Sequence, residues 1–70
     1  MKYLIILEPT NTGFSAYSPD IQGCIATGYT EEETKANMAE AIEFHLEGLS
    51  EAGEKIPATQ SKAVYVEIAA

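Results

Sequence analysis

The sequence predicts an α+β domain of order β-β-β-α-β, an antiparallel meander of strands with one long helix packed on it. Three observations predict this class: short apolar runs separated by turn residues, a capped amphipathic segment after them, and a final β-branched run. The 70 residues form one domain, residues 1–70. At this length only about 60% of the unfolded chain's surface becomes buried, so we expect a thin core.

The first two strands are predicted to form a hairpin. Residues 2–7 (KYLIIL) predict a strand, and because both of its faces are apolar, we expect both to be covered. Residues 9–13 (PTNTG) are a turn cluster in which Asn and Gly suit positive φ angles. Residues 14–18 (FSAYS) then predict a second strand, antiparallel to the first.

A turn and a third strand follow. Residues 19–23 predict a connecting turn or bulge, because proline cannot donate to a strand ladder and glycine tolerates unusual backbone angles. Residues 24–29 (CIATGY) predict the third strand. Small side chains alternate along one face of this strand, which suits a helix that approaches closely: Cys24, Ala26 and Gly28.

The helix has clear start and stop signals. Thr30 followed by Glu33 matches a capping box, so we expect a helix from residue 31 to residue 52. Gly53 suits the C-terminal end of that helix, and residues 62–68 (KAVYVEI) predict a fourth strand. One helical face has the spacing of a core stripe and carries Thr34, Met38, Ile42, His45, Leu46, Leu49 and Ala52.

The opposite helical face is acidic and carries Glu33, Glu40, Glu43, Glu47 and Glu51. Phe44 lies off the apolar stripe, flanked by Glu40 and Glu47. Two interpretations stay open. A row of glutamates is usually a solvated face, but an aromatic side chain beside acidic residues is also typical of a surface that docks lysines or arginines of a protein partner.

Net charge narrows the classes of partner. Four lysines and no arginine against eleven carboxylates give a formal charge of −7. Such a chain repels phosphate backbones, so we expect no direct nucleic-acid binding, whereas a basic protein would be attracted. Residues 1–10 are too short for a signal peptide or a membrane span. The single cysteine fits a reducing compartment, and we expect a cytoplasmic protein without membrane association.

No catalytic, cofactor-binding or metal-binding residue is predicted. Cys24 is predicted to be buried and structural, because a reactive thiolate needs a nearby base, cation or helix N-terminus. His45 lies on the apolar stripe without a cysteine or histidine at metal-ligand spacing. Asp20 lies in a turn and lacks the second group that acid–base catalysis requires. An enzyme that uses Cys24 or Asp20 is the least supported alternative.

Several short segments follow one another in a distinctive order: Tyr17-Ser18-Pro19-Asp20, Gly23-Cys24, Gly28-Tyr29-Thr30-Glu31-Glu32, Asn37-Met38-Ala39-Glu40-Ala41-Ile42, His45-Leu46-Glu47-Gly48-Leu49 and Gly53-Glu54-Lys55-Ile56-Pro57. Each segment is a weak signal by itself, but the combination is specific. Together they resemble the pattern of the HicB antitoxin family.

The resemblance implies a partial RNase H-like fold, and a partner: family members bind and block HicA, a small basic toxin that cleaves messenger RNA. It does not imply nuclease activity here, because that chemistry needs several carboxylates around metal ions and residues 2–8 contain only Glu8. Many family members continue into a ribbon-helix-helix or helix-turn-helix segment that binds DNA. We expect this sequence to lack such a segment, because it stops directly after the predicted strand of residues 62–68.

The expected function is therefore that of an antitoxin-like module that sequesters a basic HicA-type toxin. The alternative is an acidic, oligomeric structural or regulatory module without a toxin partner and without catalysis. We expect a homodimer or homotetramer, because one helix covers only one face of the sheet. The residues predicted to contact a partner are Tyr17, Asp20, Glu40, Glu43, Phe44 and Glu47.

Overall fold

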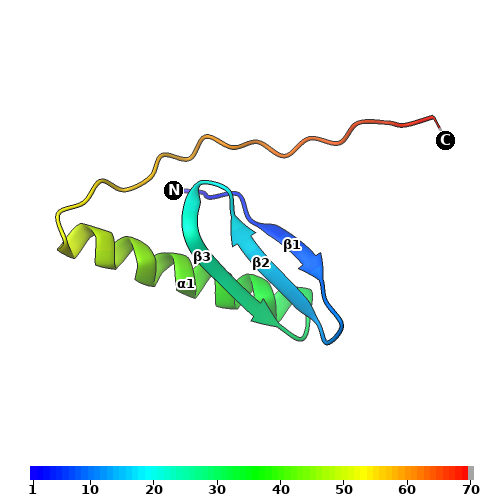
Figure 1. Cartoon of the computed structure of the whole chain (residues 1–70), viewed down its shortest axis with the longest axis horizontal. Coiled ribbons are helices and arrows are strands. Elements are labelled where there is room, and N and C mark those ends of the chain that lie inside the picture. Colours follow the sequence, from blue (N-terminus) through cyan, green and yellow to red (C-terminus); the bar gives the residue numbers. More distant parts are fainter. Residues whose placement is uncertain (70) are drawn as a thin grey trace.

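A computed structural model, which describes residues 1–69, has three antiparallel strands followed by one long helix (Figure 1). The strands are β1 (Ile6–Pro9), β2 (Phe14–Ser18) and β3 (Ile21–Gly28), in the sheet order β1-β2-β3. The helix α1 (Glu31–Glu51) lies on one face of the sheet and confirms the α+β class. The fully buried core between sheet and helix is small and consists of Ala16, Ile21, Cys24 and Met38.

The first strand pairs over a shorter range than residues 2–7. Ile6 is opposite Tyr17, and β2 ends at Ser18, so the residues before Ile6 have no strand to pair with. The Ser18 hydroxyl donates to the Leu4 carbonyl at 2.8 Å, so a side-chain hydrogen bond holds the residues before β1 next to the end of β2. Tyr3, Ile5 and Leu7 nevertheless pack against the core, so one of the two apolar faces of this segment is covered within the protomer.

The third strand begins at Ile21 rather than at residue 24. Only Pro19 and Asp20 form the turn, and the register between β2 and β3 shifts at Tyr17 and Ser18. Gly23 has a φ of 79°, a value that glycine adopts without strain, so the chain remains in the strand through this irregularity. The prediction of a turn or bulge over residues 19–23 is thus confirmed as a short turn followed by a bulge.

Hydrogen bonds at the start of α1 confirm the predicted cap. The Glu33 amide donates to Thr30 Oγ1 at 3.0 Å, which satisfies one of the unpaired amides of the first turn. The Glu33 carboxylate reaches back and accepts from the Tyr29 amide at 2.8 Å, one residue before the usual partner in a capping box.

The end of α1 lies at Glu51, with Ala52 as C-cap and Gly53 at a φ of 72°. The Glu54 amide donates to the Leu49 carbonyl at 2.8 Å, a closure that is typical of a glycine-terminated helix. The helix extends beyond the strands in Figure 1, so the last residues of the predicted apolar stripe have no sheet beneath them. Ala52 is accordingly exposed, although the sequence placed it on the core face.

Close packing of α1 on β3 explains the small residues of that strand. A Cβ atom on Gly28 would lie 2.6 Å from Thr34 Oγ1 and 2.8 Å from the Thr34 amide nitrogen. Thr34 is fully buried, and its hydroxyl donates to the Thr30 carbonyl at 2.7 Å. Cys24, on the same face of β3, is also buried, as predicted.

The predicted fourth strand is wrong for this structure. Residues 54–69 form an extended segment, and residues 62–68 pair with no strand (Figure 1). The reason lies in the hydrogen bonds that hold the segment before residue 62. The Tyr3 hydroxyl donates to the Pro57 carbonyl, and Asp20 accepts from Gln60 and Ser61, so the chain is led across the end of the sheet.

Candidate functional site

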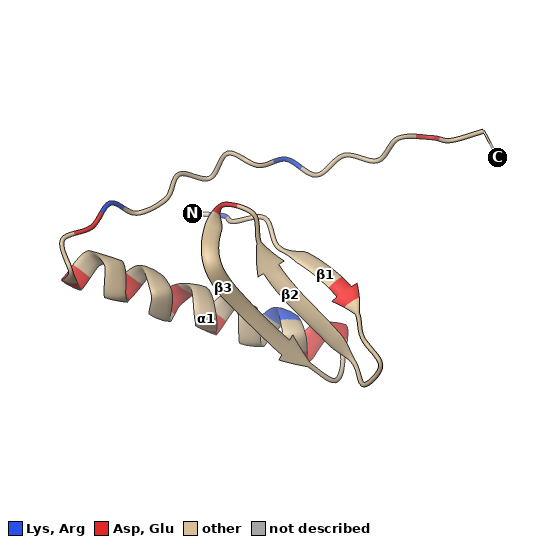
Figure 2. Ribbon diagram, viewed as in Figure 1, with Lys and Arg blue, Asp and Glu red and all other residues tan. Residues whose placement is uncertain are grey.

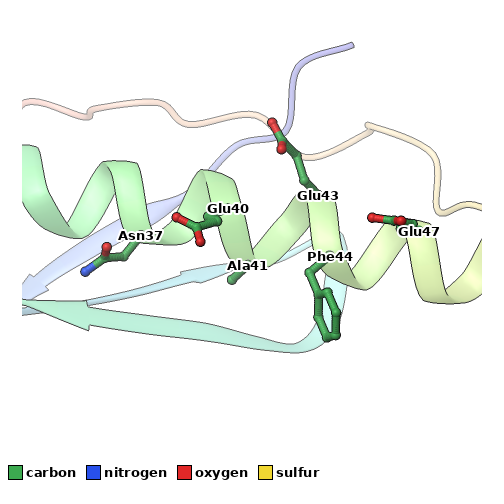
Figure 3. A pocket seen from close by; sticks show the side chains of 6 residues that line it. All are labelled: Asn37, Glu40, Ala41, Glu43, Phe44 and Glu47. Carbon is green, nitrogen blue, oxygen red and sulfur yellow. The ribbon is translucent and has the colours of Figure 1, made fainter.

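The outer face of α1 carries four of the six predicted contact residues in one shallow hollow. Glu40, Glu43, Phe44 and Glu47 line it together with Asn37 and Ala41, and its volume is about 490 Å³. These positions recur every three or four residues, which places them on one side of the helix. Figure 3 shows Glu43 and Phe44 pointing in opposite directions, and along the helix they lie between Glu40 and Glu47.

Phe44 is the most distinctive residue of this surface, because 79% of its side chain is exposed. It points toward the β3 side of the helix, where it also borders a second hollow with Ile25 and His45 (Figure 3). An exposed phenylalanine contributes little to the stability of the free protein. At a protein interface it can become a buried anchor, and aromatic residues are enriched among the residues that dominate binding energy.

The electrostatics of α1 favour a basic partner. Lys35 is its only basic residue, and none lies in its last turn (Figure 2). The C-terminal end of a helix carries a partial negative charge, which basic residues usually offset. Here Glu47 and Glu51 add to that charge instead of reducing it. This half of the helix is therefore a concentrated negative surface in the free protein.

The other two predicted contact residues lie elsewhere. Tyr17 pairs with Ile6 on one side and Ile25 on the other, and its ring is 41% exposed. Because the neighbouring Ala16 faces the core, Tyr17 lies on the sheet face that α1 does not cover. The structure thus separates Tyr17 from the acidic face and places it in an apolar row across the three strands.

Asp20 is occupied by contacts within the chain. Its Oδ2 accepts from the Gln60 and Ser61 amides, both at 3.1 Å, and its Oδ1 accepts from the Ser61 hydroxyl at 2.7 Å. The Ser61 hydroxyl bond and then the backbone bonds hold the pKa of the Asp20 carboxyl below its usual value. Its observed role is to hold the C-terminal segment, which the sequence did not indicate.

The chemistry of the remaining candidates agrees with a structural role. Burial raises the pKa of the Cys24 thiol, which favours the protonated and less nucleophilic form. His45 is half-buried on the sheet side of α1. Among residues 1–69, no group of three or more His, Cys, Asp or Glu side chains is placed to hold a metal ion. No helix of that part of the chain has the length and apolar character to cross a membrane.

Sequence reasoning missed the residues that anchor the C-terminal segment, Tyr3 and Asp20. Tyr3 bonds to a residue 54 positions further along the chain, and Asp20 bonds to residues 40 and 41 positions further along. No local sequence pattern indicates such contacts. It also missed Asn37, whose side chain donates to the Thr27 carbonyl of β3 at 2.9 Å and fixes α1 to the edge of the sheet.

The protein is a small α+β domain in which one capped helix covers an antiparallel meander. The outer face of that helix is exposed and carries acidic residues and an aromatic side chain. Residues 3–69 match the family described as the HicB_like antitoxin of bacterial toxin-antitoxin systems, so this chain belongs to that antitoxin family. The family assignment confirms the resemblance found in the sequence.

Similar proteins come from a phage and from bacteria. A protein of the rep-hol intergenic region of Haemophilus phage HP1 is 38% identical over 66 residues, which are 94% of this chain and 50% of the phage protein. A UPF0150 protein of Synechocystis is 36% identical over 79% of this chain and 71% of its own length. A UPF0150 protein of Helicobacter pylori is 37% identical over 59% of this chain and 57% of its own length.

A solved structure described as the HicA3 and HicB3 toxin-antitoxin complex contains a chain of the same fold. The two chains superpose with a TM-score of 0.74 at 35% identity, over 86% of this chain and 70% of the other. This chain spans only half the length of the phage relative, because the aligned residues make up 50% of that protein.

Proposed function

We propose that this chain is an antitoxin that binds and blocks a small basic toxin of the HicA type, an enzyme that cleaves messenger RNA. Two observations support the proposal together. The chain belongs to the antitoxin family, and a relative of the same fold occurs in a complex of HicA3 and HicB3. The single observation that carries it in this molecule is the outer face of α1, where Phe44 lies exposed among glutamates.

The proposed docking surface consists of Glu40, Glu43, Phe44 and Glu47. Its glutamates would attract the lysines and arginines with which a ribonuclease binds RNA, and the net charge of −7 would speed the encounter. Phe44 would then enter a pocket of the toxin and slow dissociation. A toxin whose basic surface is covered in this way cannot bind the phosphate backbone of its substrate.

The protein itself would act by occupation of the toxin and not by catalysis. We propose that it binds no nucleic acid directly, works in the cytoplasm, and associates as a homodimer or homotetramer. Self-association would use the uncovered sheet face, where Ile6, Tyr17 and Ile25 form an apolar row across β1, β2 and β3. Tyr17 is thereby assigned to self-association, and Asp20 to the anchoring of the C-terminal segment.

Phe44→Ala tests the proposed anchor. We expect the variant to dissociate from the toxin at least tenfold faster, because truncation of an anchor residue costs about 2 kcal/mol or more of binding free energy. Tyr29→Ala is the matched control, since Tyr29 is also an aromatic residue with an exposed side chain (77%) but lies before α1, away from the docking surface.

The measurement is the dissociation rate of the toxin from immobilised variants, together with cleavage of a reporter messenger RNA by the toxin. The toxin for these assays would be a small basic protein of the HicA type encoded beside the gene for this chain. Unchanged toxin binding by Phe44→Ala, with loss of the oligomer instead, would transfer Phe44 to the self-association surface. Continued RNA cleavage at saturating amounts of the unaltered chain would overturn the antitoxin function.

A further inference from the structure

The end of the chain forms an apolar arm without a binding partner in the protomer. We define the arm as residues 62–68, the part that follows the anchored Ser61. Val64, Val66 and Ile68 are 80, 77 and 74% exposed. The Cα radius of gyration is 13.9 Å, compared with roughly 11 Å expected for a compact domain of this length. The excess indicates that the arm projects from the body of the protein (Figure 1).

The composition of the arm is that of a buried strand. Val64, Tyr65, Val66 and Ile68 are β-branched or aromatic, the types that are enriched in strands and depleted in solvated tails. Lys62 and Glu67 cancel each other, so the arm is neutral in a chain of net charge −7. A neutral apolar segment suits contact between two copies that otherwise repel each other.

The protomer also has an apolar groove that lacks an occupant. The groove has a volume of about 440 Å³ and lies between α1 and the N-terminal residues. Its lining is mostly apolar, with Met1, Tyr3, Ile5, Ala39, Ile42 and Leu46, and it also includes the oppositely charged Lys35 and Glu43 of α1. Its lining residues Tyr3 and Ile5 directly precede β1, an outer strand of the sheet whose other edge pairs with β2. The edge of β3, by contrast, is approached by α1, whose Asn37 side chain donates to the Thr27 carbonyl.

We propose that the arm of one copy pairs with the free edge of β1 in a second copy and fills the groove beside it, while the second copy's arm does the same in return. This exchange supplies the fourth strand that the sequence predicts. It rests on the self-association proposed above, to which it adds a contact separate from the sheet face of Tyr17, and not on toxin binding. Reciprocal exchange is closed and two-fold symmetric, so it leaves neither an arm nor a groove unoccupied.

The contacts of the segment before the arm explain why the occupant is a second copy and not the same chain. Pro57 is bonded by Tyr3, and Gln60 and Ser61 are bonded by Asp20 in the turn between β2 and β3. These contacts carry the chain across the end of the sheet and away from its own β1 edge. A basic protein partner, in turn, would be attracted to the acidic face of α1 rather than to a neutral arm.

The first test breaks the arm. In Val64→Asp with Val66→Asp, we expect the dimer to dissociate at least tenfold more readily than the unaltered dimer. The residues of the arm are exposed in the protomer, so the helical circular dichroism should not change. Asn11→Asp with Thr12→Asp is the matched control, because it adds the same two carboxylates in an exposed turn. Light scattering after size-exclusion chromatography, over a range of concentrations, gives the mass of each variant.

The second test blocks the groove from the helix side. Ala39 is exposed at the groove, so Ala39→Trp is expected to fill it and to weaken the dimer as much as the arm variant does. Ala36→Trp, at an exposed position of α1 outside the groove lining, is the control and should leave the dimer intact. Amides of residues 64–68 should exchange slowly in the unaltered dimer and quickly in both groove and arm variants.

Two outcomes would overturn the exchange. One is an unaltered chain that is monomeric at concentrations of about 100 μM and above, a range in which an exchanged dimer is expected to form. The other is a dimer that survives both the arm and the groove variants. Toxin binding by the arm variant separates this inference from the proposed function. If the arm variant is monomeric and still binds the toxin, both the exchange and the antitoxin function are supported. If the arm variant remains a dimer but no longer binds the toxin, the arm belongs to the toxin interface and the exchange is overturned.

Discussion

At the scale of single residues, Asp20 changes its role between sequence and structure. A carboxylate after proline in a turn suggests only local turn chemistry. The structure instead gives it three hydrogen bonds from Gln60 and Ser61, at 2.7 to 3.1 Å, and these bonds hold the segment that leads into the arm. The sequence could not predict this role, because the donors lie 40 and 41 positions further along the chain.

This contact predicts a specific pH dependence. The hydrogen bonds lower the pKa of Asp20 below its usual value of 3.8, so the folded state binds its proton more weakly than the unfolded state. The stabilisation is therefore complete above that value and is lost as the pH falls through the lowered pKa. We expect the amides of Gln60 and Ser61 to stay protected from pH 7 down to about pH 4, and to lose protection below it.

The measurement is a pH titration of these two amides by NMR, with Asp20→Asn as comparison. The asparagine side chain has one acceptor oxygen and cannot reproduce the three bonds, so its Gln60 and Ser61 amides should be weakly protected at every pH. Loss of protection in the unaltered chain between pH 7 and pH 5, far above the carboxyl pKa, would contradict the account of the anchor.

At the scale of elements, the helix was predictable because its signals are local. Thr30, Glu33 and Gly53 determine where α1 starts and ends through contacts within a few residues, and the observed bounds differ by one residue at its end. The apolar periodicity also predicts the acidic outer face correctly. The lengths of β1 and β3 were less predictable, because they depend on the register shift at Tyr17 and Ser18.

The fourth strand shows where local pattern stops being informative. Residues 62–68 have the composition of a strand, but pairing requires a neighbour, and the contacts of Tyr3 and Asp20 lead them away from the edge of β1. Likewise, Tyr17 shares no surface with the acidic face, because strand alternation turns it to the opposite side of the sheet. The wrong fourth strand and the separate position of Tyr17 both come from tertiary arrangement, while the contact role of Tyr17 stays a prediction.

The packing of α1 on β3 predicts opposite effects for two glycines. Gly28→Ala places a Cβ atom 2.6 to 3.0 Å from atoms of Thr34, two of which belong to the helix backbone, so we expect a loss of about 1–3 kcal/mol in unfolding free energy. Gly48→Ala adds a methyl group inside α1 with no atom within 4 Å, so we expect a gain of about 0.5–1 kcal/mol.

Urea unfolding followed by circular dichroism, at one fixed protein concentration, measures both variants. The fixed concentration is needed because self-association adds to apparent stability. The pair acts as its own control, since the same substitution is made at a close contact and at an open helix position. Equal effects of the two changes would show that the close approach of α1 to β3 is not as tight as described.

At the scale of the whole molecule, two surfaces divide the work. The acidic outer face of α1 carries most of the negative charge of the helix, whose acidic positions recur along its length in Figure 2. The arm is apolar and neutral, and the groove is lined by apolar side chains together with Lys35 and Glu43; we propose that the arm and the groove serve contact between copies. The two surfaces adjoin at Glu43, which lines both, and we propose the acidic face for a basic partner and the groove for a second copy.

A charge-reversal variant tests whether the acidic face of α1 receives the toxin. In Glu43→Lys with Glu47→Lys, we expect association with the basic toxin to slow at least tenfold at low salt, because long-range attraction sets the encounter rate. The difference should shrink as ionic strength rises, since salt screens exposed charges beyond about 8 Å at 0.15 M. Glu8→Lys with Glu32→Lys makes the same change in net charge outside the docking surface and is the control.

The measurement that tests the central claim most directly is the association rate of the small basic toxin with these two charge-reversed variants, recorded from low to high salt. The account predicts a large, salt-dependent decrease for Glu43→Lys with Glu47→Lys and a much smaller one for the control. An association rate at low salt equal to that of the unaltered chain, or an equal decrease in both variants, would contradict the acidic face of α1 as the surface that binds the toxin.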